Sequence, residues 1–352
     1  KVGYKTVEKE IFLKPKDIKE FSFKLEPVSY LKITGEPTAV SVKLNGREIS
    51  PATTLTLQPG TYTVTIEKEG FESTSKKVVL KPGEGKIIKY ELLPKYHVVE
   101  LPFEAKLFVN GYEVLKGPGK ILLREGFYFI EVVWKNGKWA DLILLDKDVL
   151  LNKKEVATLI LGGDPLRTTF TIDKKIHVPP KILHLKPGEY KVSITHEGIR
   201  EETTIKLLSG SCVELFPKIE GKGFVYVLTI PSGIQASIDG EIVGTTPILL
   251  HMVDSGIRKL GIYGFKDMSI MIESSKVQVI KKKISGKALL KLRFEGADIF
   301  LDGKFLGKDE VEATVETGIH ELVFRNKDRN VYKILIDGVS PKISISNEDI
   351  GR

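Results

Sequence analysis

Cysteine and long apolar runs are scarce in this sequence of 352 residues, and both shortages limit what it can be. One cysteine, Cys212, excludes an internal disulfide framework and a zinc site built from several cysteines. Charged residues interrupt the apolar stretches well short of the ~20 residues that a membrane-spanning helix needs. We therefore expect stability to come from packing alone, and membrane contact only through segments outside these residues.

Glutamine is also rare, with three residues among a large population of lysine and glutamate, a bias typical of proteins from hot environments. The net charge of +8 would suit an anionic partner such as nucleic acid. However, the lysines are spread among 46 acidic residues, and their densest run is only Lys281, Lys282 and Lys283. We interpret the charge as a solvated surface and expect no nucleic-acid partner.

The sequence does contain a repeat that is marked by tight turns. Asn-Gly or Asp-Gly pairs stand between alternating apolar runs, and such pairs supply the positive φ angles of a two-residue β-hairpin turn. A glycine and a strand of period two follow each pair, as in "QPGTYTVTIE". The predicted turns are Asn45 with Gly46, Asn110 with Gly111, Asp239 with Gly240 and Asp302 with Gly303, and Asp173 with Lys174 is a weaker version.

The second residues of these turns stand at positions 46, 111, 174, 240 and 303, a spacing of 63 to 66 residues. This spacing is too long for one supersecondary unit and suits a small complete domain. We therefore predict a tandem array of five repeats, preceded by the C-terminal half of another. The predicted ranges are 28–94, 95–162, 163–219, 220–286 and 287–352, with the half repeat at 1–27.

Each repeat reads as six or seven short strands separated by glycine, proline and asparagine turns, without helical periodicity. This pattern predicts an all-β chain of small Ig-like antiparallel β-sandwiches. The linkers, such as "LLPKYH", are short and contain proline, so we expect a semi-rigid rod in which neighbouring repeats touch.

Residues 1–27 match residues 68–94 without a gap at nine of 27 positions. They are expected to form the last two strands of a sandwich whose front half lies upstream, so the parent protein is expected to be longer. Strand donation between molecules was weighed against this and disfavoured, because the fifth repeat reads through its own closing strands.

Residues 229–265 combine several turn motifs in a fixed order. These are the turn at Pro231 to Ile234, Asp239 with Gly240, the Gly244 to Pro247 segment, Gly256, and Gly264 with Phe265. This pattern resembles the PEGA-domain family. The namesake alanine is replaced by Ile234, and the other repeats keep mainly the turns and strands. The resemblance implies a small β-sandwich of bacterial and archaeal surface proteins, often in tandem, without catalytic residues.

No combination of residues in the sequence predicts catalysis, a cofactor or a metal site. Cys212 alternates like a core residue, and no partnered base stands near it in sequence. Asp146 and Asp148 loosely resemble the start of a calcium loop, but a charged hairpin is the preferred interpretation. Trp139 is the best candidate for surface binding, for example to a glycan, because "VVWKNGKWAD" surrounds a turn, whereas Trp134 is expected in the core.

The sequence therefore favours a non-enzymatic structural or adhesive protein of the cell surface or envelope, acting as a rod-like spacer or as part of a surface layer. Self-association or binding to other envelope proteins is expected, in an extracellular or periplasmic location. The alternative is a ligand-binding or sensing ectodomain, with a glycan as one ligand class, that belongs to a larger membrane-anchored protein.

Overall fold

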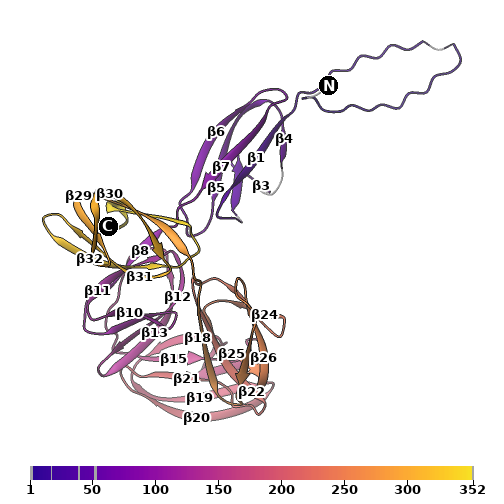
Figure 1. The fold of residues 1–352 in the computed structure, drawn as a ribbon. Coiled ribbons are helices and arrows are strands. Elements are labelled where there is room, and N and C mark those ends of the chain that lie inside the picture. The colour runs from indigo at the N-terminus through magenta and orange to yellow at the C-terminus, as the bar shows by residue number, and fades with distance from the viewer. Residues whose placement is uncertain (1–2, 17, 39, 51–53, 351–352) are drawn as a thin grey trace. The chain divides into compact units, whose positions relative to one another are not determined.

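The structure is a computed structural model that describes residues 3–16, 18–38, 40–50 and 54–350. In these ranges the chain consists of strands and loops apart from one short helix, α1 (Asn347–Ile350), which confirms the all-β prediction. None of the described residues belongs to a helix that could cross a membrane. The chain divides into an N-terminal unit of residues 1–95 and a C-terminal unit of residues 96–352 (Figure 1).

The N-terminal unit contains one complete sandwich, named sandwich 1. Its strands are β1 (Ser29–Glu36), β2 (Ser41–Leu44), β3 (Arg47–Ile49), β4 (Leu55–Leu57), β5 (Gly60–Glu67), β6 (Thr74–Leu80) and β7 (Gly85–Glu91). One sheet has the order β4-β1-β7 and the other the order β3-β2-β5-β6. All pairs are antiparallel except β1 with β7, because the last strand crosses from the second sheet and runs beside the first strand in the same direction.

Alternating side chains build the core of sandwich 1. Along β5, Val64 and Ile66 are buried and alternate with threonines, and β1 contributes Leu31 and Ile33 to the same core. Each fully buried side chain of this size stabilises the fold by about 1.5–3 kcal/mol relative to the exposed side chain.

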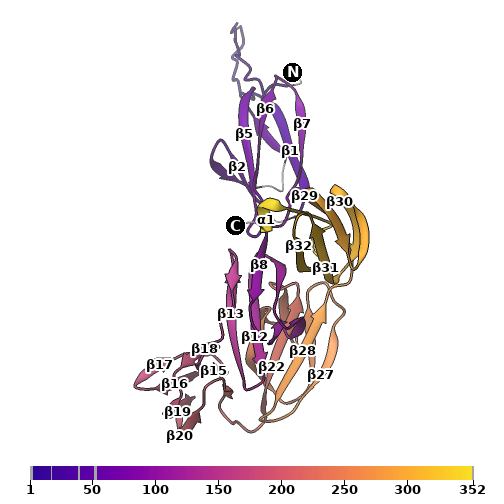
Figure 2. The same cartoon turned by 90° about the vertical axis from the view of Figure 1, so that its left-hand side faces the viewer.

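The C-terminal unit contains four more sandwiches. Sandwich 2 has β8 (Tyr96–Leu101), β9 (Lys106–Val109), β10 (Tyr112–Lys116), β11 (Gly119–Arg124), β12 (Gly126–Trp134), β13 (Gly137–Leu145) and β14 (Val149–Leu150). Sandwich 3 has β15 (Ala157–Leu161), β16 (Thr168–Ile172), β17 (Lys175–His177), β18 (Lys181–Leu185), β19 (Gly188–His196), β20 (Ile199–Leu207) and β21 (Cys212–Leu215). Figure 2 shows β17, β16, β19 and β20 side by side in one sheet.

Sandwich 4 repeats the same strand order as sandwich 3, and sandwich 5 merges its early strands into two long ones. Sandwich 4 has β22 (Lys222–Ile230), β23 (Gln235–Ile238), β24 (Glu241–Thr245), β25 (Ile248–Asp254), β26 (Gly256–Ile262), β27 (Met268–Ile272) and β28 (Val277–Lys283). Sandwich 5 has β29 (Lys287–Leu301), β30 (Lys304–Glu316), β31 (Gly318–Arg325), β32 (Arg329–Ile336) and β33 (Lys342–Ser346).

The predicted boundary at residues 162 and 163 between the second and third repeats is wrong by one strand. β15 pairs with β18 and β21, so the third sandwich begins at Ala157. The two-residue strand β14 stands where sandwich 1 has the seven-residue strand β7. Sandwich 3 therefore begins at Ala157, earlier in the sequence than the residue 163 predicted from the spacing of the turns.

The expectation of a rod is also wrong for the C-terminal unit. β11 of sandwich 2 pairs in parallel with β32 of sandwich 5, which places Ile121 opposite Lys333 and Leu122 opposite Ile334. This pairing joins strands of both sandwiches into one eight-stranded sheet (Figure 1). In a linear array, sandwiches 2 and 5 would be separated by two others, so the four sandwiches of this unit are not in line.

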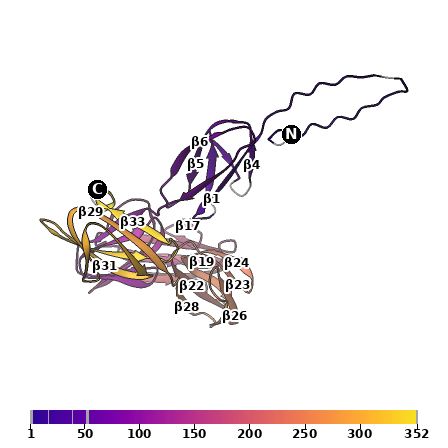
Figure 3. The same cartoon turned by 45° about the horizontal axis from the view of Figure 1, so that its top comes forward.

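The two strands expected within residues 1–27 are not formed in the described ranges 3–16 and 18–27. These residues run as an open loop that closes in one bridge between Tyr4 and Pro27 (Figure 3). The corresponding strands of sandwich 1, β6 and β7, lie in different sheets and pair with β5 and β1. Since β6 and β7 do not pair with each other, their counterparts in residues 3–27 need other strands as partners.

Candidate functional site: the junctions between sandwiches 2 to 5

An apolar cluster joins three sandwiches of the C-terminal unit. Phe129 of sandwich 2, Ile160 of sandwich 3 and Phe224 of sandwich 4 are buried in it together. The ring centroids of Phe129 and Tyr226 are 6.0 Å apart, and those of Phe216 and Phe224 are 4.4 Å apart. Aromatic pairs at such distances contribute about 0.5–1.5 kcal/mol beyond the burial of their area. The three sandwiches therefore share one core in addition to their own.

The sequence of β22 explains why this strand can serve two cores. Its run "FVYVLTI" is almost continuously apolar, which is typical of a strand that is covered on both faces. Val225 and Val227 face the core of sandwich 4 itself. Phe224 and Tyr226 face the opposite way and enter the shared cluster.

A predicted turn takes part in a second junction. Asn110 is fully buried, and its Nδ2 donates a hydrogen bond of 2.8 Å to the carbonyl oxygen of Thr229 in sandwich 4. The Nζ of Lys281 donates to the carbonyl oxygen of Gly111, at 3.0 Å. A Cβ atom at Gly111 would lie 2.8 Å from the Lys281 side chain and 3.0 Å from Leu228, so glycine permits this close approach. The turn therefore docks sandwich 2 on sandwich 4.

A buried ion pair lies at the edge where β11 meets β32. The Nε of Arg124 is 2.8 Å from Oδ2 of Asp337, and both side chains are largely buried. The other oxygen of Asp337 accepts a hydrogen bond from the backbone N–H of Val339. Burial lowers the pKa of Arg124, but the charge of Asp337 and the neighbouring tyrosines outweigh this and raise the pKa overall. The guanidinium therefore stays charged, and the pair joins sandwich 2 to sandwich 5.

Cys212 lies in a polar junction between sandwiches 2, 3 and 4. The hydroxyl of Tyr226 donates to Glu214 at 2.7 Å, and Lys138 forms an ion pair with Glu131 at 2.5 Å. Burial raises the pKa of the Cys212 thiol to about 11, although Lys138 opposes the shift. A thiol with so high a pKa is a poor nucleophile at neutral pH.

The prediction that Trp139 binds a surface ligand is wrong, because its side chain is only 1% exposed. The hairpin of β12 and β13 places Trp139 directly opposite Val132, and opposed residues share a face of the sheet. Val132 belongs to the core of sandwich 2, so Trp139 belongs there too. Trp134, expected in the core, is partly buried at its edge and packs against Gly137 and Gly210.

The four predicted Asn-Gly and Asp-Gly turns, at residues 45–46, 110–111, 239–240 and 302–303, have positive φ at both residues. The side chain of the first residue also ties the hairpin to the strand that begins at the next marker glycine, because its Oδ1 accepts a backbone N–H there. The bonds run from Thr63 to Asn45, from Phe129 to Asn110, from Lys259 to Asp239 and from Glu321 to Asp302, at 2.7 or 2.8 Å. Asp173 and Lys174 also have positive φ.

Sequence reasoning missed a side chain that recurs two residues after the marker glycine of every sandwich. In each case its tip donates to the backbone carbonyl four residues upstream, at 2.8 or 2.9 Å, as in the tyrosine corner of other β-sandwiches. The pairs are Tyr62 with Gln58, Tyr128 with Arg124, Tyr190 with Lys186, Arg258 with Asp254 and His320 with Glu316. The signal was the recurrence of a long side chain with a polar tip at this one position.

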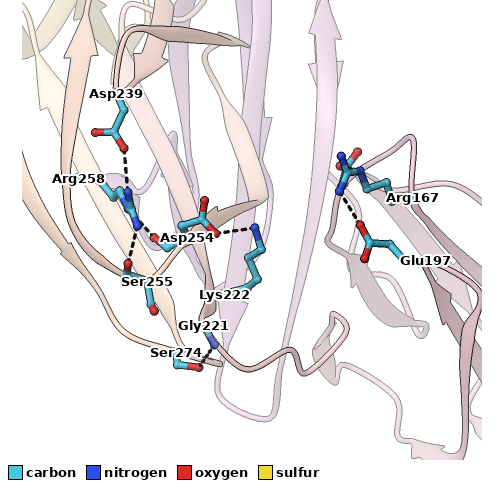
Figure 4. A network of polar contacts seen from close by, with 10 residues as sticks. Arg167, Glu197, Gly221, Lys222, Asp239, Asp254, Ser255, Arg258 and Ser274 are labelled. Carbon is cyan, nitrogen blue, oxygen red and sulfur yellow. Dashed lines mark hydrogen bonds and ion pairs between the residues drawn. The ribbon is translucent and has the colours of Figure 1, made fainter.

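Figure 4 shows how Arg258 extends this corner into a network at one end of sandwich 4. Its guanidinium also donates to the carbonyl of Ser255 at 2.7 Å and lies 3.3 Å from Asp239. Lys222 pairs with Asp254 at 2.5 Å. The hydrogen bond from Lys259 and the charge of Arg258 hold the pKa of Asp239 below its usual value. These contacts fasten the turn at this end of the sandwich.

Shallow polar clefts lie at equivalent places in sandwiches 5 and 1, beside the cross-strand pairs Asp298 with Arg325 and Ser41 with Glu67. The cleft of sandwich 5 has a volume of about 610 Å³ and includes Asp298, Lys308 and Arg325. The cleft of sandwich 1 has about 430 Å³ and includes Ser41 and Glu67. Both are open to solvent and offer hydrogen-bonding groups of both charges to a polar ligand.

Among the described residues, no group of three histidine, cysteine, aspartate or glutamate side chains is placed to hold a metal ion. Asp148, weighed as part of a calcium loop, instead accepts a hydrogen bond of 2.8 Å from the backbone N–H of Val98. This bond fixes the loop after β13 against β8. The predicted charged hairpin is wrong, because β13 and β14 lie in different sheets and β14 pairs with β8 instead.

Comparison with known families matches residues 28–96 to the PEGA domain. The match covers sandwich 1, whereas the sequence motifs had pointed first to the fourth repeat. No curated protein matches the chain in sequence.

Solved structures with some similarity include arrays of Ig domains. The Bacillus anthracis TIE protein also matches, with 12% identity, a TM-score of 0.19 and coverage of 88% of this chain and 75% of that one. The N-terminal four Ig domains of Dscam1 isoform 1.9 have 11% identity, a TM-score of 0.11 and coverage of 73% and 94%. Immunoglobulin domains 1–5 of Sidekick-1 have 10% identity, a TM-score of 0.11 and coverage of 89% and 97%. These scores are too low to carry an argument, so the fold assignment rests on the sheet topology.

Proposed function

We propose that this protein, whose residues 28–96 are a PEGA domain, is a non-catalytic structural protein of the cell surface or envelope that holds its sandwiches in a fixed arrangement. The pairing of β11 with β32 carries the proposal, because it fastens two sandwiches that are distant in sequence. The shared apolar cluster and the Arg124–Asp337 pair reinforce the same arrangement. A set of independent binding modules would not need such junctions.

In this proposal the C-terminal unit is a rigid block and sandwich 1 is a separate module attached to it in sequence. Such a protein can act as a spacer or as an assembly element that presents fixed surfaces to other copies or to other envelope proteins. An extracellular or periplasmic location belongs to the proposal, and the PEGA match at residues 28–96 supports it.

Electron microscopy of the full chain over a range of concentrations tests the proposal. Ordered filaments or sheets are the expected result. A monodisperse monomer at every concentration, together with saturable binding to a panel of glycans, would contradict the structural role.

A second candidate is a ligand-binding ectodomain, and the polar clefts of sandwiches 1 and 5 favour it. Replacement of Arg325 by alanine in the cleft of sandwich 5 should weaken binding to a glycan panel if that cleft is the site. Replacement of Arg293, an exposed side chain on β29 outside the cleft, serves as the control.

A further inference from the structure

Residues 3–27 carry exposed apolar side chains at positions whose counterparts in sandwich 1 are buried. Ile11 is 42% exposed and Phe21 is 37% exposed, although the residues 67 positions later, Val78 and Ile88, are each only 8% exposed. Leu13 is exposed as well, and its counterpart Leu80 is buried in the core of sandwich 1. The exposed side chains therefore stand at core positions of a sandwich.

The backbone of this segment already has the geometry of the last two strands of a sandwich at its base. Lys5 donates to Glu26 and Val28 donates to Gly3, just as Glu72 donates to Leu93 and Lys95 donates to Gly70. One β-bridge closes each segment, between Tyr4 and Pro27 in the first and between Phe71 and Pro94 in sandwich 1.

One side-chain contact between the two arms is also the same in both copies. The Nζ of Lys19 donates to the carbonyl of Phe12 at 3.2 Å, and the Nζ of Lys86 donates to the carbonyl of Val79 at 2.6 Å. The two arms of the loop therefore match β6 and β7 at their base and at this contact, although the strands themselves are not formed.

The apolar side chains of the segment fall into two sets, an inward phase whose counterparts in sandwich 1 face the core and an outward phase whose counterparts face the solvent. A specific partner would bury only the inward phase. Ile11 and Phe21 are in the inward phase, because their counterparts face the core of sandwich 1. Phe12 and Ile18 are in the outward phase, since they correspond to Val79, which is exposed, and to Gly85.

Sandwich 1 shows which strands would cover the segment. There β6 adds to β5 in antiparallel pairing, and β7 adds to β1 in parallel pairing, while the side chains of β1, β2 and β5 fill the core. A partner must therefore offer two open strand edges, one in each of two sheets, with an apolar core between them.

We propose that residues 3–27 dock as the sixth and seventh strands of a five-stranded partial sandwich of the β1–β5 type, and complete one further sandwich with it. The partner is a polypeptide segment with the pattern of residues 28–67. A second copy of this chain is not suited to the role, because β6, β13, β20, β27 and β32 already occupy the edge that a sixth strand needs in each of the described sandwiches. The first strands of sandwiches 1, 3, 4 and 5 are also covered, by β7, β21, β28 and β33, whereas β14 covers only two residues of β8 in sandwich 2.

The test adds a polypeptide of residues 28–67 to the native full chain and follows hydrogen exchange and binding. We expect a complex with one probe per chain, and slowed exchange in residues 7–13 and 18–24 with unchanged exchange in β6 and β7. A double variant in the inward phase, Ile11→Lys with Phe21→Lys, should weaken binding about tenfold or more, because it would bury two charges without partners.

The matched double variant in the outward phase, Phe12→Lys with Ile18→Lys, should bind the probe like the native chain. Equal loss in both double variants would overturn the proposal, since it would indicate a general apolar attraction. Self-association of the native chain through residues 7–24 without the probe would also overturn it, since a second copy would then be the occupant.

If the separate probe polypeptide aggregates, a fusion protein that contains the same residues replaces it. Residues 28–67 placed directly before Lys1 reproduce the natural junction of Glu67 with Lys68, because Lys1 corresponds to Lys68. We expect residues 7–13 and 18–24 of this fusion to exchange as slowly as β6 and β7. Fast exchange there in a fusion whose sandwich 1 is intact would refute the proposal.

Discussion

The first strands of sandwiches 1 and 4 occupy the same place in the same fold but have different surroundings. Both pair in parallel with the last strand of their own sandwich, with Ile33 opposite Ile88 and Val227 opposite Ile280. In β1 the outward residue Tyr30 is 41% exposed, whereas its counterpart in β22, Phe224, is 0% exposed. The inner faces build equivalent cores, and only the outer faces differ.

This difference shows how one fold serves both as a separate module and as part of a larger block. The alternation of β1 leaves a polar outer face that needs no neighbour. The continuous apolar run of β22 requires a second cover, which sandwiches 2 and 3 supply. The outer face of one strand thus decides whether a sandwich stands alone or joins a shared core.

The largest difference between β1 and β22 is expected when the outer aromatic side chain of each strand is removed. Phe224→Ala should lower the free energy of unfolding of the C-terminal unit by about 3–5 kcal/mol, because it leaves a cavity in the shared cluster. Tyr30→Ala should cost less than about 1 kcal/mol, as for other exposed positions. Hydrogen exchange of the full chain measures both units in one sample, and equal losses would contradict the comparison.

The buried ion pair gives the next effect. Asp337→Ala should destabilise the C-terminal unit by about 3 kcal/mol, because Arg124 would remain charged and buried without its partner. The control is Glu67→Ala in sandwich 1, which breaks the exposed pair with Lys43 and should have a far smaller effect. Chemical denaturation, followed by hydrogen exchange in each unit, measures the loss of stability in both variants. A larger loss for Glu67→Ala than for Asp337→Ala would refute the role of Arg124 and Asp337 as a buried ion pair that stabilises the unit.

The matched turns give a smaller effect. Asn110→Ala should cost about 1–3 kcal/mol, since it leaves the buried carbonyl of Thr229 and the N–H of Phe129 without partners. Asn45→Ala removes the same bond from an exposed turn, where water replaces it, and should cost about 0.5–1.5 kcal/mol. Thermal unfolding measures the loss of stability in each variant, and the loss should be larger for Asn110→Ala than for Asn45→Ala. Equal losses would mean that Asn110 makes no contact with sandwich 4.

The smallest of these expected effects is an unequal loss of stability in the hairpin turns at low pH. The pKa of Asp239 is lowered in the folded protein by the hydrogen bond from Lys259, so its contribution is present above the unfolded pKa of about 4 and is lost as the pH falls through the folded pKa. Between pH 6 and pH 3 the hydrogen-exchange protection factors should therefore fall more in the hairpin of β23 and β24 than in that of β2 and β3, which has Asn45. Asp239→Asn should remove this acid-dependent part, and an unchanged pH profile in that variant would contradict the account.

The strands and turns of each sandwich could be predicted from the sequence because their signals are local. Asn45 with Gly46 and the alternation of Val64 and Ile66 depend on neighbouring residues only. The prediction for Trp139 was wrong although the sequence contains the information. Alternation along β12 places Val132 in the core, and the turn places Trp139 opposite Val132, so Trp139 belongs in the core as well.

The junctions could not be predicted, because they join residues that are far apart in sequence. The run in β22 indicates a strand with both faces covered, but nothing local says that Phe129 and Ile160 cover it. Likewise, Arg124 and Asp337 are 213 positions apart, the difference of their residue numbers, and neither stands in a recognisable motif. The missed corners are different, since Tyr62 and its counterparts could have been found by aligning the repeats at the marker glycine.

The most direct test of the account is the hydrogen-exchange rate at the edge where sandwich 2 meets sandwich 5 in the native full chain. If β11 and β32 are paired, the amides around Ile121 to Leu122 and Lys333 to Ile334 should exchange as slowly as those of the inner strands β8 and β31. The outer strands β20 and β27, each of which has a strand on one side only, give the rate of an unpaired edge in the same sample. Exchange in β11 and β32 as fast as in β20 and β27 would contradict the fixed arrangement on which the proposed structural role depends.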